Sequence, residues 1–302
     1  MATLLAGTEA GLVELTPDDL PATVAFAGRS VDALSWGPSG WWALVDAAEV
    51  WHVEGEGDWE RHAAATGPSL TCLAATPAGL LVGTAEAHLA RVTDGHLERV
   101  DAFDHAQGRD RWYTPWGGPP DTRSVSADAD GTLFVNVHVG GILRSADHGR
   151  SWRPTIDIHA DVHQVLAGAA PGLVLAACAE GLALSDDAGI SWRIDDGDLH
   201  ATYSRAVAAT ASTAVISTST GPGGAHSALY RRRLAAAWGF ERCRTGLPEW
   251  FDGNVDTGCL VADAGTVAAA TGGGEVFVSH DEGVTWQRWA TDLPPVRCLA
   301  LA

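Results

Sequence analysis

The stretch Ser145–Pro154 reads SADHGRSWRP, and close copies of it begin at Ser185 (SDDAGISWRI) and at Ser279 (SHDEGVTWQR). All three share the pattern Ser-x-Asp-x-Gly-x-[Ser/Thr]-Trp. In a tight turn the Ser and Asp side chains can bond nearby backbone groups, Gly accepts a positive φ, and Trp packs back onto the sheet. A turn motif that occurs three times indicates a recurring strand–turn–strand unit.

Short apolar strands recur with the same spacing. Pairs of them begin near residues 31, 70, 123, 163, 205 and 257, and no strong helical periodicity intervenes. A seventh unit is split: residues 296–302 (VRCLALA) form a first strand without a second, and residues 2–15 supply the missing partners. The sequence therefore predicts an all-β, seven-bladed β-propeller spanning residues 1–302 as one domain.

The split unit predicts how the propeller closes. Residues 296–301 should pair with residues 2–6, so that one blade is built from segments 2–27 and 296–302. Closing the ring in this way leaves no free sheet edge.

The three turns resemble the Asp-box, or BNR, repeat. Proteins with that repeat include sialidases, xyloglucanases, sortilin-type receptors and photosystem II assembly factors, and the chain is most similar to bacterial WD40/YVTN/BNR-like proteins. The resemblance covers most of the chain and implies a propeller with Asp-box turns. Because the group contains enzymes, receptors and assembly factors, it leaves the function class open. The Phe/Tyr-Arg-Ile-Pro signature of sialidases is absent, and sialidases have six blades.

Composition narrows the function classes. The formal net charge is −19, and all 19 basic residues are Arg. The lack of Lys excludes Lys-based catalysis, and the acidic chain argues against a nucleic-acid partner. The five Cys lack CxxC spacing, and no signal peptide or membrane span is seen. We therefore expect free thiols, a cytoplasmic location and no membrane partner.

Propeller topology assigns the loops to faces. If the strands of each blade run from the axis outward, the three boxes connect third to fourth strands on one face. The other face then carries the second-to-third turns and the linkers between blades, where His, Arg and Trp are concentrated. Loops on a rigid frame are the usual place for a site, and the axis supplies a concavity. We expect an axial ligand site on the face opposite the boxes.

Candidate catalytic residues come from several of these loops. A His or Asp would transfer a proton, and an Arg would hold an anionic group. This combination favours a hydrolase or lyase, glycosidase-like in chemistry, acting on a small polar or anionic substrate, with sugars as one such class. The predicted catalytic residues are His138, His163, His200, Tyr203, Arg205 and Asp256.

A long insert, residues 104–121, departs most from the repeat and is predicted to form a lid over or beside the site. Its aromatic residues could stack on a sugar or a planar ligand; the alternative is a surface plug between blades. The predicted ligand-binding residues are Trp112, Tyr113, Trp116, Arg123, Trp250 and Asn254.

His159, Asp161 and His163 form an H-x-D-x-H pattern. In an extended segment these side chains share one side, and imidazole with carboxylate suits a divalent metal. Metal-free acid–base chemistry and ordinary loop residues are the alternatives, and no other cofactor is indicated.

Two other function classes stay open beside the enzyme. One is a non-catalytic assembly scaffold that binds a protein partner, and the other is a sugar-binding module. A crowd of titratable and aromatic side chains on one face favours the enzyme.

Overall fold

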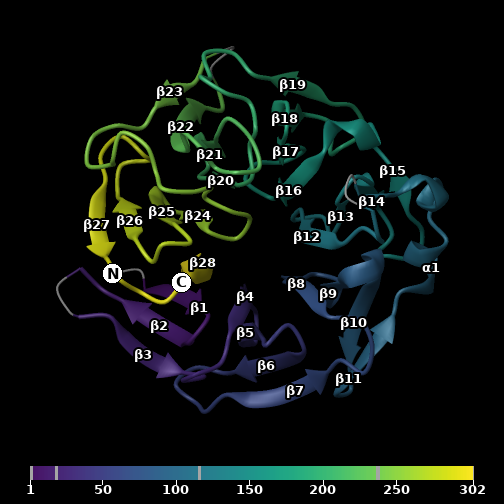
Figure 1. Ribbon diagram of the computed structural model, residues 1–302. Helices are drawn as coiled ribbons and strands as arrows, with labels where there is room; N and C mark the ends of the chain where they lie inside the picture. Colours follow the sequence, from purple (N-terminus) through teal and green to yellow (C-terminus); the bar gives the residue numbers. More distant parts are fainter. Residues whose placement is uncertain (1–2, 18–19, 115–116, 236–238, 302) are drawn as a thin grey trace. The chain divides into compact units, whose positions relative to one another are not determined.

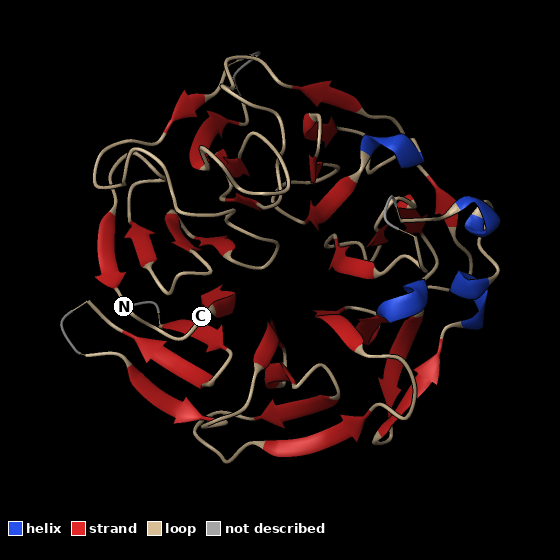
Figure 2. Cartoon of the chain, in the orientation of Figure 1, coloured by secondary structure: helices blue, strands red, loops and turns tan. Residues whose placement is uncertain are grey.

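The computed structural model describes residues 3–17, 20–114, 117–235 and 239–301. This part of the chain forms seven four-stranded, mostly antiparallel sheets and almost no helix (Figures 1 and 2). The fold is a seven-bladed β-propeller, which confirms the predicted fold class and the number of blades. None of the helices in the described ranges is long and apolar enough to cross a membrane.

The chain divides into two compact units, which are described one at a time. The first consists of Met1–Val31, Ala177–Ala183 and Ile194–Ala302. The second consists of Asp32–Ala176 and Leu184–Arg193. The prediction of a single domain stays a prediction.

The first unit contains the blade that joins the two ends of the chain. Strand β28 pairs antiparallel with β1, and Leu4 faces Leu301 while Ala6 faces Leu299. This pairing confirms the predicted closure. The blade follows the order β28-β1-β2-β3. Its strands are β1 (Leu4–Thr8), β2 (Gly11–Leu15), β3 (Ala22–Ala25) and β28 (Val296–Leu301).

Two more blades of the first unit have their strands in chain order. Small buried residues, such as Ala268 and Ala269, let these strands pack closely, and Phe251 meets Phe277 in the same core. The strands are β20 (Val207–Ala209), β21 (Thr213–Thr218), β22 (Ala228–Arg233), β23 (Glu241–Arg242), β24 (Leu260–Asp263), β25 (Thr266–Ala270), β26 (Val276–Ser279) and β27 (Gln287–Ala290).

The second unit also holds three blades. Their cores are apolar, with Phe103 and Trp152 in edge-to-face contact at 5.2 Å. The strands are β4 (Val31–Gly37), β5 (Gly40–Val45), β6 (Glu49–Val53), β7 (Glu60–Ala64), β8 (Leu70–Thr76), β9 (Gly79–Thr84), β10 (Leu89–Thr93), β11 (His96–Arg99), β12 (Thr122–Ala127), β13 (Leu133–Val137), β14 (Gly141–Ser145) and β15 (Arg153–Pro154).

The remaining blade carries residues of both units and has the order β16-β17-β18-β19. Its strands are β16 (Val162–Ala167), β17 (Val174–Cys178), β18 (Gly181–Ser185) and β19 (Arg193–Asp195). The helical pieces are α1 (Asp101–Asp104) and the single-turn segments η1 (Ala85–Ala87), η2 (Arg109–Arg111) and η3 (Ile158–Ala160).

The turn between β14 and β15 has the hydrogen bonds that its sequence predicts. Ser145 Oγ donates to Asp147 Oδ1 at 2.7 Å and accepts from the Gly149 N–H at 2.8 Å. Asp147 in turn accepts from the Ser151 N–H and hydroxyl. The Trp152 indole N–H donates to the Gly149 carbonyl at 3.1 Å, and the ring is buried. Each residue of the motif therefore has a structural role.

Of the other two copies, one keeps the Trp contact of the first turn and one does not. In the β26–β27 turn, the Trp286 indole N–H donates to Gly283 O at 3.1 Å, and the ring is 4% exposed. In the β18–β19 turn the Trp192 ring is only half-buried, and its N–H donates instead to Thr155 Oγ1 at 3.3 Å. The burial predicted for this Trp is thus only partial.

Candidate functional site

The second unit places one carboxylate between two imidazoles. Asp161 Oδ1 lies 3.4 Å from His138 Nε2, and Asp161 Oδ2 lies 3.7 Å from His163 Nε2. The imidazoles are 3% and 1% exposed, whereas the Asp161 side chain is 29% exposed. At these separations the contacts are electrostatic rather than short hydrogen bonds. Asp161 is therefore the member of the group that a ligand can reach.

The surroundings of Asp161 favour its charged form. Interaction with the His138 imidazole is the main cause of a lowered Asp161 pKa; the charges of His163 and Arg123 act in the same direction, and burial opposes them. Asp161 also has φ 45° and ψ 66°, a left-handed conformation that is uncommon for a residue other than Gly. Such strained residues are concentrated at functional sites.

A buried polar contact ties together the two chain segments that carry the imidazoles. His138 is in the turn that follows β13, and His163 lies on β16. The Asn136 amide donates to the Val162 carbonyl, beside His163, at 2.8 Å and so ties β13 to β16. Within the described residues, no hydrogen bond reaches the buried Asn136 Oδ1. Asn136 was not among the predicted site residues. Its position two residues before His138 was the sequence feature that could have indicated it.

The aromatic insert reaches this site. The Tyr113 N–H donates to the Val139 carbonyl at 3.4 Å, next to His138, and the Tyr113 side chain is exposed. Trp112 instead packs on Phe103 at 5.8 Å and beneath the Arg109 guanidinium at 4.8 Å. Of the two described aromatic residues, Trp112 and Tyr113, the exposed one is therefore Tyr113. Trp116, which was predicted to bind ligand, lies outside the described residues.

The predicted metal site at His159, Asp161 and His163 is not formed. His159 is exposed in η3, and its N–H donates to Asp157 Oδ1 at 2.8 Å. In the described part of the chain, no group of three or more His, Cys, Asp or Glu is arranged to hold a metal ion. The extended conformation assumed for the H-x-D-x-H segment is replaced by a single helical turn and a left-handed residue, so the alternation of sides is lost.

His200 lies in the first unit, in an aromatic cluster. Its Nδ1 is 2.9 Å from the Tyr230 hydroxyl, and its Nε2 is 2.8 Å from the His226 carbonyl. The ring also packs at 4.8 Å on Trp250, which carries the Arg242 guanidinium at 3.8 Å on its ring. Burial is the main cause of a lowered His200 pKa. Because both nitrogens are engaged, the contacts favour a structural role for the neutral ring.

The remaining candidates of the first unit are engaged in local contacts. Arg205 Nε lies 2.7 Å from Asp256 Oδ1, so this guanidinium already has a carboxylate partner. Tyr203 forms an isolated backbone bridge with Ser219. The Asn254 amide donates to the Pro222 carbonyl at 3.1 Å. Of the predicted catalytic residues, His138 and His163 meet in the second unit. The first unit contains the other four, His200, Tyr203, Arg205 and Asp256.

Comparison with known proteins supports the fold. No protein-family model matches the chain, and no curated protein does. A protein from Lactobacillus plantarum matches with a TM-score of 0.67 and 12% identity over 100% of both chains. An ancestral GH74 enzyme matches with a TM-score of 0.63 and 13% identity over 100% of this chain and 40% of that one. YCF48 bound to D1 peptide gives a TM-score of 0.59 and 14% identity over 96% and 88%. At these identities the likeness concerns the fold alone.

Proposed function

We propose that the group centred on Asp161 is the working site of a hydrolase or lyase that acts on a small, polar, sugar-like ligand. The observation that carries this proposal is the placement of one accessible carboxylate between the buried imidazoles of His138 and His163. A buried pair of imidazoles facing one carboxylate serves proton transfer better than it serves folding, because burying polar rings costs free energy.

The side chains around Asp161 suit a hydroxylated ligand. The charged carboxylate accepts hydrogen bonds from hydroxyl groups, and the exposed Tyr113 offers a ring on which a sugar face can stack. Arg123, whose charge acts on Asp161, would hold an anionic substituent. The ligand in this proposal is therefore a polyhydroxylated molecule, with or without a carboxylate.

The chemistry proposed is general acid–base catalysis within one carboxylate–imidazole group. Glycosidases of the common type use two carboxylates, one of which has a raised pKa. The leading charged influences on the Asp161 pKa are His138, His163 and Arg123, and none of these is a carboxylate. We therefore favour proton abstraction or water activation by Asp161 and a neighbouring imidazole, as in a lyase or a single-base hydrolase.

The test uses a panel of nitrophenyl glycosides, read by nitrophenolate release, and uronate oligosaccharides, read by ultraviolet absorbance of the unsaturated product. Asp161→Asn should lower kcat for an active panel member by about 10²-fold or more, since general acid–base groups typically contribute 10²–10⁴-fold. Asp157→Asn, which alters an exposed carboxylate four residues away, is the matched control. Equal kcat for the two variants would contradict the proposal.

We also propose that the chain belongs with the Asp-box propellers. The support is the shared hydrogen-bond pattern of the three Ser-Asp-Gly-Trp turns. We also propose that the protein is cytoplasmic and that it binds neither nucleic acid nor a membrane.

An assembly scaffold is the second candidate. Its support is the structural similarity to YCF48, which was solved with a D1 peptide. With a net charge of −19, this chain would select a basic peptide segment. Isothermal titration with an Arg-rich and a matched Glu-rich peptide separates the candidates. The scaffold predicts binding of the basic peptide that persists in Asp161→Asn.

A further inference from the structure

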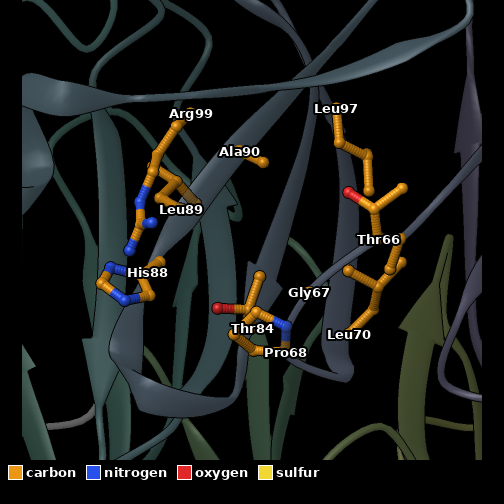
Figure 3. Close-up of a pocket in the computed structure, with 11 residues that line it drawn as sticks. Thr66, Gly67, Pro68, Leu70, Thr84, His88, Leu89, Ala90, Leu97 and Arg99 are labelled. Carbon is orange, nitrogen blue, oxygen red and sulfur yellow. The ribbon is translucent and has the colours of Figure 1, made fainter.

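A cavity lies in the second unit, and its lining does not include Asp161 or the imidazoles beside it. It has a volume of about 170 Å³ and opens between the β7–β8 linker and strands β10 and β11 (Figure 3). The side chains used in the argument are Leu70, Leu89, Ala90, Leu97, His88 and Arg99. Figure 3 shows Arg99 and His88 on one side and Leu97 and Leu70 on the other. The cavity thus has a cationic wall and an apolar wall.

The cationic wall is built around Asp104. Its carboxylate contacts His88 Nδ1 at 2.7 Å and Arg99 Nε at 2.6 Å, and Arg109 Nη2 lies 3.7 Å away. Arg109 is fixed further by a hydrogen bond to the Ala87 carbonyl at 2.6 Å. Two guanidinium groups therefore share one carboxylate. The wall keeps an excess of positive charge in a protein whose net charge is −19.

Arg99 keeps donors available for a ligand. The Nε contact to Asp104 fixes the guanidinium, and no described residue is hydrogen-bonded to its two terminal amino groups. The side chain is 50% exposed, so a molecule entering from solvent can reach it. Two parallel N–H groups on one guanidinium match the two oxygens of a carboxylate.

The apolar wall sets the size of the ligand. Leu70 is 3% exposed, Leu89 is fully buried and Ala90 is 8% exposed. The cavity volume of about 170 Å³ suits a ligand with only a few heavy atoms. A carboxylate with a chain of about three carbons fills that space.

We propose that this cavity binds a small monocarboxylate with a short alkyl chain, with the carboxylate on Arg99 and His88 and the chain against Leu70 and Leu97. The site is independent of the group around Asp161.

The test uses n-butyrate as the probe, with the methyl resonances of Leu and Ala followed by NMR during titration. We expect saturable shifts at Leu70, Leu89, Ala90 and Leu97. Butyramide has the same shape without the charge, and it should bind at least about 10-fold more weakly, the factor that ~1.4 kcal/mol of charge-assisted bonding gives. Octanoate exceeds the cavity and should not bind better than butyrate.

Two variants and a control locate the site. Arg99→Gln should weaken butyrate binding about 10-fold or more. Arg61→Gln is the matched control, because Arg61 is equally exposed and pairs with Glu49 at 2.9 Å, outside the cavity. Ala90→Leu should fill the cavity and abolish the shifts while leaving Arg99 in place. The proposal is overturned by equal binding of butyrate and butyramide, by equal affinities of the two Arg variants, or by no saturable shift at tens of millimolar butyrate in the folded wild-type protein.

Discussion

Single residues explain why three copies of one turn are not equivalent. Trp152 and Trp286 are buried and donate to the Gly carbonyl of their own turn, whereas Trp192 is half-buried and donates to Thr155. A Cβ on Gly189 would lie 2.6 Å from the Phe134 ring, so Phe134 packs closely against this middle turn. The motif predicted all three turns from sequence. It could not predict the different Trp contacts, because these depend on neighbouring strands.

The first prediction follows from this difference. Trp152→Ala and Trp286→Ala should each lower the free energy of unfolding by about 3–5 kcal/mol, because removing a buried indole leaves a cavity. Trp192→Ala should cost less, since its ring is already half in water. Denaturant unfolding of the three variants measures the difference. A cost for Trp192→Ala equal to the other two would contradict the burial argument.

The aspartates of the same turns predict how stability changes in acid. A hydrogen bond from the Ser151 side chain is the main cause that lowers the Asp147 pKa to about 2. For Asp281, burial acts to raise the pKa, but hydrogen bonds, chiefly from Thr285, outweigh it and lower the pKa to about 2. Their ordinary pKa is 3.8, so this stability is fully present above about pH 4 and is lost as pH falls towards 2. The urea midpoint of wild type should drop through that window. Asp147→Asn and Asp281→Asn should show a smaller drop, and Asp94→Asn, in an exposed turn, should behave like wild type.

Strands were the elements that sequence predicted best. Alternation of short apolar runs with turns located the seven units and the pairing of the chain ends. The H-x-D-x-H segment was the clear failure, since η3 and a left-handed Asp161 replace the expected extended strand. Of the residues in and around the candidate site, the sequence singled out His138, His163, Tyr113 and Arg123, and it singled out Asp161 as a metal ligand. It did not predict the 3.4 Å contact of His138 with Asp161, because that contact is formed between blades and leaves no local pattern.

The prediction at the scale of an element concerns β28. Deleting residues 296–302 removes the strand that covers β1, including the partners of Leu4 and Ala6. The exposed apolar edge should cause loss of cooperative unfolding or aggregation. Circular dichroism during heating and light scattering measure these outcomes. A deletion variant that melts like wild type would show that the pairing adds nothing to stability.

For the whole molecule, electric charge is the dominant surface property. Because the net charge is −19, the carboxylates repel one another, and this repulsion is stronger in the compact folded state than in the unfolded chain. Some pairs escape solvent screening, such as Arg232 and Asp195 at 2.5 Å, both 3% exposed. Exposed pairs, such as Arg61 with Glu49, are screened and contribute little.

Salt should therefore stabilise this protein. Raising NaCl from about 10 mM to about 150 mM shortens the Debye length from ~30 Å to ~8 Å and weakens the repulsion among carboxylates. We expect Tm to rise over this range at pH 7, measured by scanning calorimetry. A fall in Tm would mean that attractive ion pairs outweigh the net repulsion.

The pairing of β1 with β28 also has a consequence for synthesis on the ribosome. Leu4 is synthesised about 300 residues before its partner Leu301, so the two can pair only after the chain between them has been made. At about 5–20 residues per second this delay is roughly 15 to 60 s. Throughout it, the nascent β1–β3 hairpins expose an uncovered backbone edge. Vectorial folding can finish the intervening blades in turn, but of the seven blades the one begun by β1–β3 is completed last, and a chaperone that binds nascent chains would find its target there.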